Sequence, residues 1–277
     1  MQVQKLATRK TSKTKNDNFL SRLIVISAAS FLLFLFFKNY NSQIRYFFNS
    51  KFGTTAAEIR DEKNTKRQNL KILNHHQDKV FGIDVSEYQD NINWNTLGSI
   101  DKHQIKFMFV RATVGTDRVD TKFKEYWAQA DKKFYRGAYH YYRPNENSLE
   151  QANLFIKTVK LEKGDFPPVL DIEKLPKNQS IDSLKVGLQR WLDRVEGHYG
   201  VKPIIYSGDK YYTDFLEQEF SDYIFWIAHY NFFENEINQK WQFWQFTEKA
   251  KIQGIRGNVD LNIFNGDIQN LKDLLVD

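Results

Sequence analysis

The chain has 277 residues, of which 41% are hydrophobic and 16% aromatic, enough for one large or two small folded domains. Its formal net charge of +6 is carried by residues 1–38, which hold seven bases and one acid, while the remainder holds 33 of each and is neutral. The charge is therefore no sign of nucleic-acid binding, and the lack of cysteine excludes disulfides, thiolate metal sites and a cysteine nucleophile.

The first predicted element is an apolar segment near the N-terminus. Residues 23–37 are fifteen uncharged, mostly apolar residues, about 22 Å long as a helix, and residues 19–22 extend the helix to about 28 Å. A cleaved signal peptide has a similar basic start, but the bulky and polar residues 36–40 lack a small-residue cleavage site, which favours a retained anchor. Because the bases precede the segment, we expect a cytoplasmic tail over 1–18, a transmembrane helix over 19–38, and a body on the periplasmic or cell-wall side.

Residues 39–79 are predicted to link this segment to the body. The stretch from Thr54 to Lys79 is polar and charged, which is typical of a tether or an exposed helix. The adjacent His75 and His76 diverge on any regular element and have no third ligand nearby, so we interpret them as a solvated pair rather than a metal site.

From residue 80 to residue 277, strands and helices alternate in one folded domain. Eight strands are predicted, over residues 80–85, 105–111, 134–142, 166–173, 203–207, 223–228, 242–247 and 258–264. A helix is predicted after each of the first five strands, over residues 94–101, 121–133, 148–160, 180–199 and 210–216, and a last one over 267–275. Ser148 and Gln151 predict a capping box for the third helix, and Gly200 predicts the end of the fourth. The pattern favours an α/β fold, an irregular and abbreviated TIM-like barrel of parallel strands, with five βα units followed by three strands.

Four acidic residues fall at strand ends, where parallel barrels gather their active sites. Asp171 and Glu173 close the fourth strand with one residue between them, so we expect them on the same side, roughly 6–7 Å apart. Asp84 lies on the first strand and Asp260 on the eighth, which are neighbours in a closed barrel. Taken alone, Asp171 and Glu173 are also compatible with a polar strand end that leads into a loop.

Aromatic residues occupy comparable positions near the strand ends, where each alone is more often part of a hydrophobic core. Beside four acids, however, ring faces are suited to stack on the apolar faces of sugars, while charged and amide groups bind the hydroxyl groups. The residues that we expect to line such a sugar-binding cleft are Arg111, Tyr139, Tyr141, Tyr206, Trp226, Tyr230, Trp244 and Gln245.

A cleft of this kind is suited to glycoside cleavage. The reaction needs one acid to protonate the leaving oxygen and a second carboxylate to stabilise or attack the anomeric carbon. Clustered acids raise one another's pKa, which keeps one of them protonated near neutral pH. Glu173 has the longer side chain and is the candidate general acid, with Asp171 as its electrostatic partner. Asp84 and Asp260 are expected to orient the substrate or to tune Glu173.

Eight short segments, in order over residues 81–265, resemble glycoside hydrolase family 25, the lysozymes that act as N-acetylmuramidases on bacterial peptidoglycan. They are Gly82-Ile-Asp-Val-Ser86, Phe109-Val-Arg-Ala-Thr113, Gly137-Ala-Tyr-His-Tyr141, Val169-Leu-Asp-Ile-Glu173, Ile205-Tyr-Ser207, Trp226-Ile-Ala228, Trp244-Gln-Phe-Thr247 and Gly257-Asn-Val-Asp-Leu261. The resemblance implies a barrel of five βα units and three strands. It places the family's acids at Asp84, Asp171, Glu173 and Asp260, with Glu173 as the general acid.

The chain departs from the family pattern at two positions. Arg111 stands where the family often has lysine, which keeps the charge, and Val114 stands where it often has glutamate, which removes a carboxylate from the cleft rim. Within the family mechanism, Asp171 is either a nucleophile or the residue that orients the substrate's own N-acetyl group. Its place beside Glu173 favours the second role.

Together with the apolar segment, the resemblance implies a membrane-anchored lysozyme with residues 80–277 as its catalytic domain. It would hydrolyse the β-1,4 bond between N-acetylmuramic acid and N-acetylglucosamine in peptidoglycan glycan strands, with no cofactor, metal or nucleic acid. A non-catalytic peptidoglycan-binding module on the same fold is the alternative, although none of the four acids is missing. A metal-dependent hydrolase using His140 or His229 is disfavoured because these histidines lie in separate strands without metal-ligand spacing.

Overall fold

The computed structural model describes residues 56–131, 133–231 and 236–277, and the tail and transmembrane helix expected over residues 1–38 lie outside this part of the chain. The chain divides into two compact units, residues 1–61 and 62–277, and the second contains all the strands of the described residues. No helix within the described ranges is long and apolar enough to cross a membrane.

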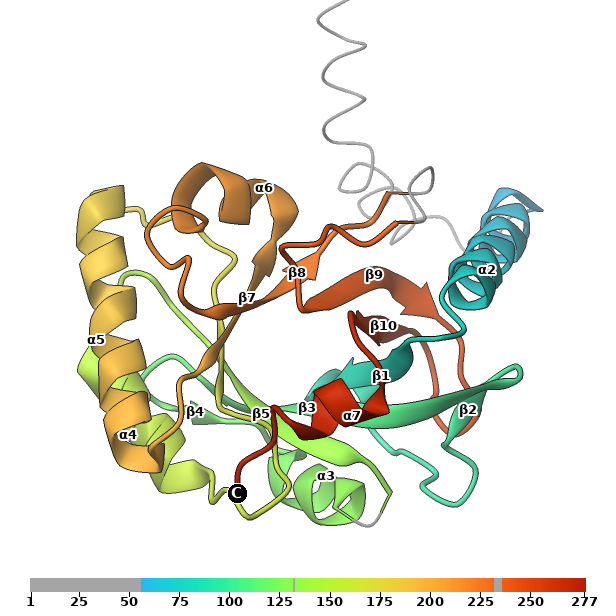
Figure 1. Cartoon of the computed structure of the whole chain (residues 1–277), viewed down its shortest axis with the longest axis horizontal. Coiled ribbons are helices and arrows are strands. Elements are labelled where there is room, and N and C mark those ends of the chain that lie inside the picture. The colour runs from blue at the N-terminus through green and yellow to red at the C-terminus, as the bar shows by residue number, and fades with distance from the viewer. Residues whose placement is uncertain (1–55, 132, 232–235) are drawn as a thin grey trace, which may run out of the picture. The chain divides into compact units, whose positions relative to one another are not determined.

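Eight strands of the second unit form a closed barrel with helices around it (Figure 1). In order around the barrel they are β1 (Val80–Val85), β3 (His103–Val114), β5 (Tyr135–Tyr141), β6 (Val169–Asp171), β7 (Ile204–Gly208), β8 (Ile224–Ala228), β9 (Phe243–Ala250) and β10 (Val259–Phe264). The pairing of β10 with β1 closes the ring, and two short strands, β2 (Ser99–Ile100) and β4 (Arg118–Val119), pair with the two ends of β3. The abbreviated α/β barrel expected from the sequence is confirmed.

The last strand runs in the opposite direction from the other seven. β10 pairs antiparallel with both β9 and β1, whereas the pairs from β1 around to β9 are parallel. Parallel neighbours need a crossover of about a dozen residues or more. Only residues 251–258 connect β9 to β10, so the chain turns back directly. The prediction of a parallel barrel is therefore wrong at β10.

Helices α3 (Phe123–Ala130), α4 (Ser148–Thr158) and α5 (Ile181–Tyr199) follow β3, β5 and β6. After β7 the chain forms α6 (Asp209–Tyr211) and a π-helical turn (Tyr212–Leu216). The hydroxyl of Ser180 caps α5 by accepting a hydrogen bond from the amide of Ser183. The helix ends at Gly200, as predicted, where a φ of 72° is accessible to glycine without strain.

Two local predictions are wrong, one at the start of a helix and one before β2. The side chain of Asn147, not that of Ser148, caps α4. Residues 94–101 form turns and β2 instead of a helix, because Ser99 and Ile100 pair with the start of β3.

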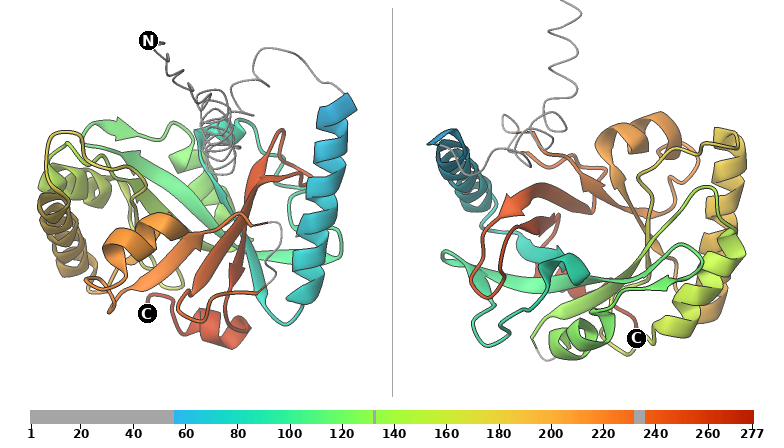
Figure 2. Two further views of the ribbon diagram at one scale, coloured as in Figure 1. Left: turned by 90° about the horizontal axis from the view of Figure 1, so that it is seen from above. Right: turned by 180° about the vertical axis from the view of Figure 1, so that it is seen from behind.

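Helix α2 (Ala56–His75) occupies the stretch that was expected to be a tether or an exposed helix. Its last turns are not exposed, because Ile72 and Leu73 are buried in the core between helices and strands. The side chain of Asn74 bonds to His103 at the start of β3, at 3.1 Å. Figure 2 shows the helix leading into β1 along the barrel wall. The folded body therefore begins inside the predicted linker.

Aromatic rings fill the base of the barrel. Phe107, Phe109 and Phe166 pack with their ring centroids 5.2–5.9 Å apart. Gly137 makes room for them, since a Cβ at this position would lie 2.4 Å from the ring of Phe109. Because side chains alternate along a strand, Arg111 faces the same way as Phe107 and Phe109 but lies nearer the open end of the barrel.

The C-terminal segment closes the base. After β10 the chain forms α7 (Ile268–Lys272), and Leu271 of this helix is buried against the aromatic rings. The backbone of Val276 exchanges hydrogen bonds with Gly164 and Asp165, at 2.8 Å each, in the loop that leads to β6.

Candidate active site

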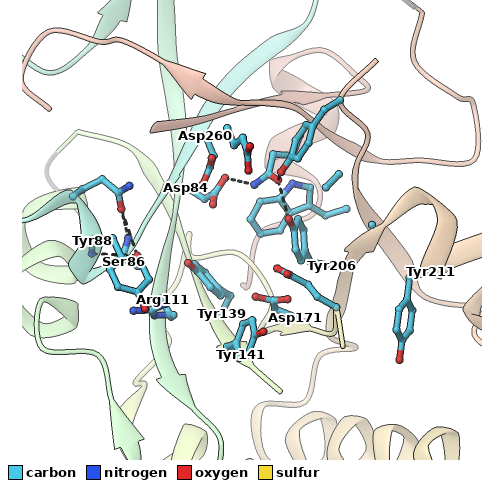
Figure 3. Close-up of a pocket in the computed structure, with 18 residues that line it drawn as sticks. Asp84, Ser86, Tyr88, Arg111, Tyr139, Tyr141, Asp171, Tyr206, Tyr211 and Asp260 are labelled. Atoms are coloured by element: carbon cyan, nitrogen blue, oxygen red, sulfur yellow. Dashed lines mark hydrogen bonds between the residues drawn. The ribbon is translucent and has the colours of Figure 1, made fainter. Parts of the chain in front are cut away.

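Inward-facing side chains of the barrel strands, and of residues just beyond them, surround a cavity of about 610 Å³ at the open end (Figure 3). The four predicted acids line it together: Asp84, Asp171, Glu173 and Asp260. The predicted sugar-binding residues that line it are Arg111, Tyr139, Tyr141, Tyr206, Trp226, Tyr230 and Gln245. The structure thus brings together residues that are up to 176 positions apart from Asp84 to Asp260.

Trp244 is the predicted sugar-binding residue that does not reach the cavity. Its neighbours Phe243 and Gln245 face the barrel interior, so Trp244 faces outward on the alternating strand. It is buried on that side, where its indole N–H donates to the carbonyl of His229 at 2.9 Å. The ring of His76 lies edge-on to it at 6.0 Å, and because His76 is buried, the prediction of a solvated histidine pair is wrong there.

Asp171 and Glu173 face the cavity together, although not from one strand as predicted. β6 ends at Asp171, and the chain beyond it is held to β7: the amide of Ile172 donates to the carbonyl of Tyr206 at 3.0 Å, and its carbonyl accepts from the hydroxyl of Ser207 at 2.6 Å. Both carboxyl groups line the same cavity, with only Ile172 between them in the chain. Asp171 is only 3% exposed, whereas Glu173 is exposed in the cavity.

Asp84 accepts hydrogen bonds from two amide side chains through a single oxygen atom. Its Oδ1 accepts from Nε2 of Gln245 at 2.8 Å and from Nδ2 of Asn262 at 2.7 Å. The Oε1 of Gln245 accepts in turn from the hydroxyl of Tyr206 at 2.8 Å. The Oδ1 of Asn262 accepts from the indole N–H of Trp226, also at 2.8 Å.

Asp260 lies opposite Asp84, near the beginning of β10 rather than at the C-terminal end of a strand. Because β10 is antiparallel to β1, its first residues share the open end of the barrel with the last residues of β1. Figure 3 shows the two residues side by side at the cavity. The reversed strand thus delivers the fourth acid to the place predicted for a parallel one.

Burial raises the pKa of all four acids above their ordinary values. The pKa of Asp171 is raised well above that value, because the charges of Glu173 and Asp84 add to burial, and the charge of Asp84 has the same effect on the pKa of Asp260. For Asp84 and Glu173, accepted hydrogen bonds favour the ionised form and partly offset the effect of burial on the pKa. Each pair therefore keeps a proton at pH values where an isolated carboxyl group has lost its own.

Arg111 is the single cation among the described residues that line the cavity. Its Nε donates to Asp120 at 2.8 Å and its Nη2 donates to Glu87 at 3.1 Å. The ring of Tyr88 covers the guanidinium group at 4.7 Å from the ring centre. These contacts from three sides fix the position of the positive charge.

Tyr88 itself was not predicted as a site residue. It lies in a short 3₁₀ helix, η1 (Glu87–Gln89), and its side chain is 73% exposed at the cavity rim. The turn is held by a capping box in which Ser86 and Gln89 bind each other's backbone amides. The Ser-x-x-Gln spacing is visible in the sequence and indicates the turn, but not that its tyrosine faces the cavity.

Three further residues of the site also escaped prediction. Asn262 lies two positions after Asp260 on the same strand, so the period of two placed it on the inward face. Glu248 lines the cavity near the end of β9, and Tyr211 lines it from α6. The sequence around Glu248 and Tyr211 carries no signal for this placement.

The two histidines of the metal-dependent interpretation do not join the acids in the cavity lining. His140 is buried between Thr113 Oγ1 at 2.7 Å and Gln151 Oε1 at 3.1 Å, and burial lowers its pKa to about 4. His229 lies 3.0 Å from a carboxylate oxygen of Asp209. In the ranges that the structure describes, no group of three or more His, Cys, Asp or Glu side chains is arranged to hold a metal ion.

Comparison with known proteins agrees with this geometry. Residues 83–255 match the model of the family described as glycosyl hydrolases family 25. The chain belongs to this family. The chain is 39% identical over 197 residues to the protein YegX of Escherichia coli (strain K12), and the match covers 70% of this chain and 72% of YegX. It is also 30% identical over 208 residues to Lysozyme M1 of Streptomyces globisporus, covering 69% and 70%.

The barrel is similar to those of solved glycosyl hydrolase and lysozyme structures. A family 25 glycosyl hydrolase from Bacillus anthracis superposes with a TM-score of 0.65 at 28% identity, covering 73% of this chain and 95% of that one. A bacterial lysozyme from Streptomyces coelicolor superposes with a TM-score of 0.63 at 27% identity, covering 70% and 96%. The predicted family is confirmed, and the chain is a glycoside hydrolase of the lysozyme, or muramidase, class.

Proposed function

We propose that the open end of the barrel hydrolyses the β-1,4 bond between N-acetylmuramic acid and N-acetylglucosamine in peptidoglycan. The observation that carries this proposal is the neighbouring pair Asp171 and Glu173, which shares an aromatic-lined cavity with a second pair, Asp84 and Asp260. Membership of family 25 and the likeness to Lysozyme M1 support the same bond and polymer.

Glu173 is the general acid in this proposal. It is exposed in the cavity while Asp171 is buried, so Glu173 is the member of the pair that reaches a glycosidic oxygen. Burial raises the pKa of both carboxyl groups, so the pair keeps its proton to higher pH than an isolated carboxyl group does. Transfer of that proton from Glu173 to the leaving oxygen accompanies cleavage of the bond to the anomeric carbon.

Asp171 orients the N-acetyl group of the substrate in this proposal, rather than attacking the sugar. Carboxyl groups that flank a sugar in retaining enzymes with a carboxylate nucleophile are about 5–5.5 Å apart. Asp171 and Glu173 instead lie on one wall of the cavity, at and just beyond the end of β6. The buried Oδ1 of Asp171 has no hydrogen-bond partner among the described residues, so it is available to accept the N–H of an acetamido group. The acetamido oxygen attacks the anomeric carbon as the bond to the leaving oxygen breaks, and water then opens the resulting cyclic intermediate at the same carbon. Two displacements retain the configuration, whereas an inverted product anomer by NMR would exclude this route.

The aromatic lining and Arg111 bind the glycan strand. Burial raises the pKa of Tyr139, Tyr206 and Tyr230 well above the ordinary tyrosine value, so their hydroxyl groups remain neutral hydrogen-bond donors. The cavity thereby offers ring faces for apolar sugar faces and neutral donors for hydroxyl groups. Tyr141 and Trp226 complete this surface together with Gln245.

Glu173→Gln tests the function. The substitution keeps the shape of the side chain and removes its proton, so we expect release of reducing-end muramic acid fragments from purified peptidoglycan to fall by about 10²–10⁴-fold, measured by mass spectrometry. Glu150→Gln is the matched control, because Glu150 is exposed on α4 outside the cavity lining and this variant retains full activity. Unchanged activity in Glu173→Gln would remove Glu173 from this role.

Membrane anchoring belongs to the same proposal. The apolar segment at residues 19–38, with its preceding bases, supports a single-pass anchor that leaves residues 1–18 in the cytoplasm and residues 80–277 outside it. The full chain should stay in the membrane fraction after an alkaline carbonate wash, and external protease should reach its folded body in cells whose outer layers are opened. Recovery of the protein in the soluble fraction would contradict the anchor.

A further inference from the structure

The directions of the hydrogen bonds around Asp84 identify which groups carry protons. The indole N–H of Trp226 can only donate, so the atom of Asn262 at 2.8 Å from it must be the amide oxygen. The amide nitrogen of Asn262 therefore faces Asp84, where it donates to Oδ1 at 2.7 Å. The hydrogen bonds from Trp226 through Asn262 therefore both donate toward Asp84.

A second chain ends on the same oxygen atom. The hydroxyl groups of Tyr206 and Tyr230 bond to Oε1 of Gln245, whose Nε2 donates to Oδ1 of Asp84 at 2.8 Å. Both amide side chains are buried, at 2% exposure for Gln245 and 0% for Asn262. An oxygen atom that accepts two buried N–H bonds has no room for a proton of its own, and these bonds stabilise its negative charge.

Asp260 stands directly opposite Asp84 on the paired strand β10, and both carboxyl groups line the cavity. Two neighbouring carboxyl groups in a buried cavity repel each other when both are ionised, so the pair holds one proton, and because Asp84 is stabilised as the ionised group, Asp260 carries it. We propose that Asn262 and Gln245 are positioning residues that keep Asp84 ionised and thereby hold Asp260 as a neutral hydrogen-bond donor in the cavity. This inference rests on the proposed function, because it assigns roles within the same site.

Other titratable groups face the Asp84–Asp260 pair from the surrounding elements. They are Arg111 on β3, Tyr139 on β5, Asp171 and Glu173 at β6, Tyr206 on β7, Tyr230 after β8 and Glu248 on β9. The negative charges of Glu248 and Glu173 raise the pKa of Asp260, which acts in the same sense as the two amides. The amides bind Asp84 and not Asp260, so they are the contacts that distinguish the two carboxyl groups.

Asn262→Asp tests the inference with little change of shape. The new side chain still accepts from Trp226, but it no longer offers an N–H to Asp84. We expect the acid limb of the kcat/KM profile to move to higher pH by about one unit or more, because ionised Asp84 loses a charge-assisted hydrogen bond. Gln245→Glu removes the other N–H and moves the limb in the same direction.

The matched control is Asn265→Asp, which makes the same chemical change just beyond the other end of β10 and leaves the limb in place. Asn265 donates to the carbonyl of Trp241 at 3.2 Å and does not line the cavity. An equal loss of activity at every pH in Asn262→Asp and Gln245→Glu, with an unmoved limb, would overturn the inference, because a purely structural role lowers activity without moving the limb.

Infrared spectroscopy gives a readout that does not depend on activity. The difference spectrum between wild type and Asp260→Asn at neutral pH should contain the carbonyl band of a protonated carboxylic acid. A carboxylate band in its place would show that Asp260 is ionised and would overturn the inference. This result holds even if peptidoglycan is not the substrate, so the failure of the inference and the failure of the proposed function can be told apart. The spectrum reports the protonation state of Asp260 even if the Asn262 and Gln245 variants do not fold.

Discussion

Trp226 and Trp244 show how one position along a strand decides what a side chain does. Both are tryptophans on barrel strands, and both were expected to stack on a sugar. The ring of Trp226 lines the cavity and its N–H holds Asn262, whereas Trp244 lies on the outer face of β9, where its N–H holds the carbonyl of His229. A tryptophan on a barrel strand can face the cavity or the outer side. The sequence did not show which face of each strand is inward, so it did not distinguish Trp226 from Trp244.

Trp244→Phe should therefore behave as a stability variant. We expect the KM for peptidoglycan to be unchanged and the free energy of unfolding to fall by about 1–2 kcal/mol, because one buried hydrogen bond and part of a buried ring are lost. Trp226→Phe is the counterpart and should lower kcat/KM, since it leaves the Asn262 oxygen without its donor. Thermal unfolding and initial rates measure both effects. A raised KM in Trp244→Phe with unchanged stability would place that ring in the cavity after all.

At the scale of elements, the sequence pattern correctly predicted the features that depend on neighbouring residues, such as the bounds of a strand or the end of a helix. The strand predicted over residues 80–85 has the observed bounds of β1, and Gly200 ends α5 as predicted. The direction of β10 was not predictable from its own residues, because the pattern of apolar residues along a strand is the same for parallel and antiparallel pairing. The short connection over residues 251–258 decides it.

The residues of the candidate site also fall into those that the sequence predicted and those that it did not. The acids Asp84 and Asp171 were predictable because they stand at the ends of clear apolar strands within family motifs. Tyr88 and Glu248 were not, because a rim residue is exposed and leaves no periodic pattern in the sequence. The pairing of Asp84 with Asp260 was also not predictable, since it depends on the register between β1 and β10.

Helix α2 supplies a test of where the folded body begins. Leu73→Ala should lower the free energy of unfolding by about 2–4 kcal/mol, because Leu73 is fully buried between this helix and the strands and its truncation leaves a cavity. Leu149→Ala is the control on α4, where the side chain is 44% exposed and the expected change is within about 0.5 kcal/mol. Denaturant titration compares the two. Equal and small changes in the free energy of unfolding of the two variants would show that α2 belongs to the linker and not to the folded body.

At the scale of the whole molecule, the concentration of acids in one cavity links stability to pH. Burial and the charge of Glu173 raise the pKa of Asp171 in the folded state above its value of 3.8 in the absence of structure. A raised pKa means that the folded state holds the proton more tightly. The contribution to stability is therefore fully present below the unfolded pKa and is lost as the pH rises through the folded one.

Asp171→Asn should consequently stabilise the protein at neutral pH while impairing catalysis. We expect a gain of about 1 kcal/mol or more in the free energy of unfolding, roughly 2–4 °C in Tm, because a buried ionisable group is replaced by a neutral one. The gain should shrink as the pH falls toward the ordinary carboxyl pKa, where wild-type Asp171 is protonated in both states. Thermal unfolding across this pH range measures it, and a gain that is the same at every pH would contradict the link to ionisation.

The reversal of β10 has a practical consequence for any use of the enzyme on a surface. A parallel last strand would have carried the chain out beside the cavity, whereas the antiparallel strand carries it to the base, where Val276 is fastened to the loop before β6. A bead, a resin or a display scaffold joined after Asp277 therefore holds the barrel by its closed end. The open end then faces away from the support, free to meet an insoluble polymer that cannot diffuse to the enzyme.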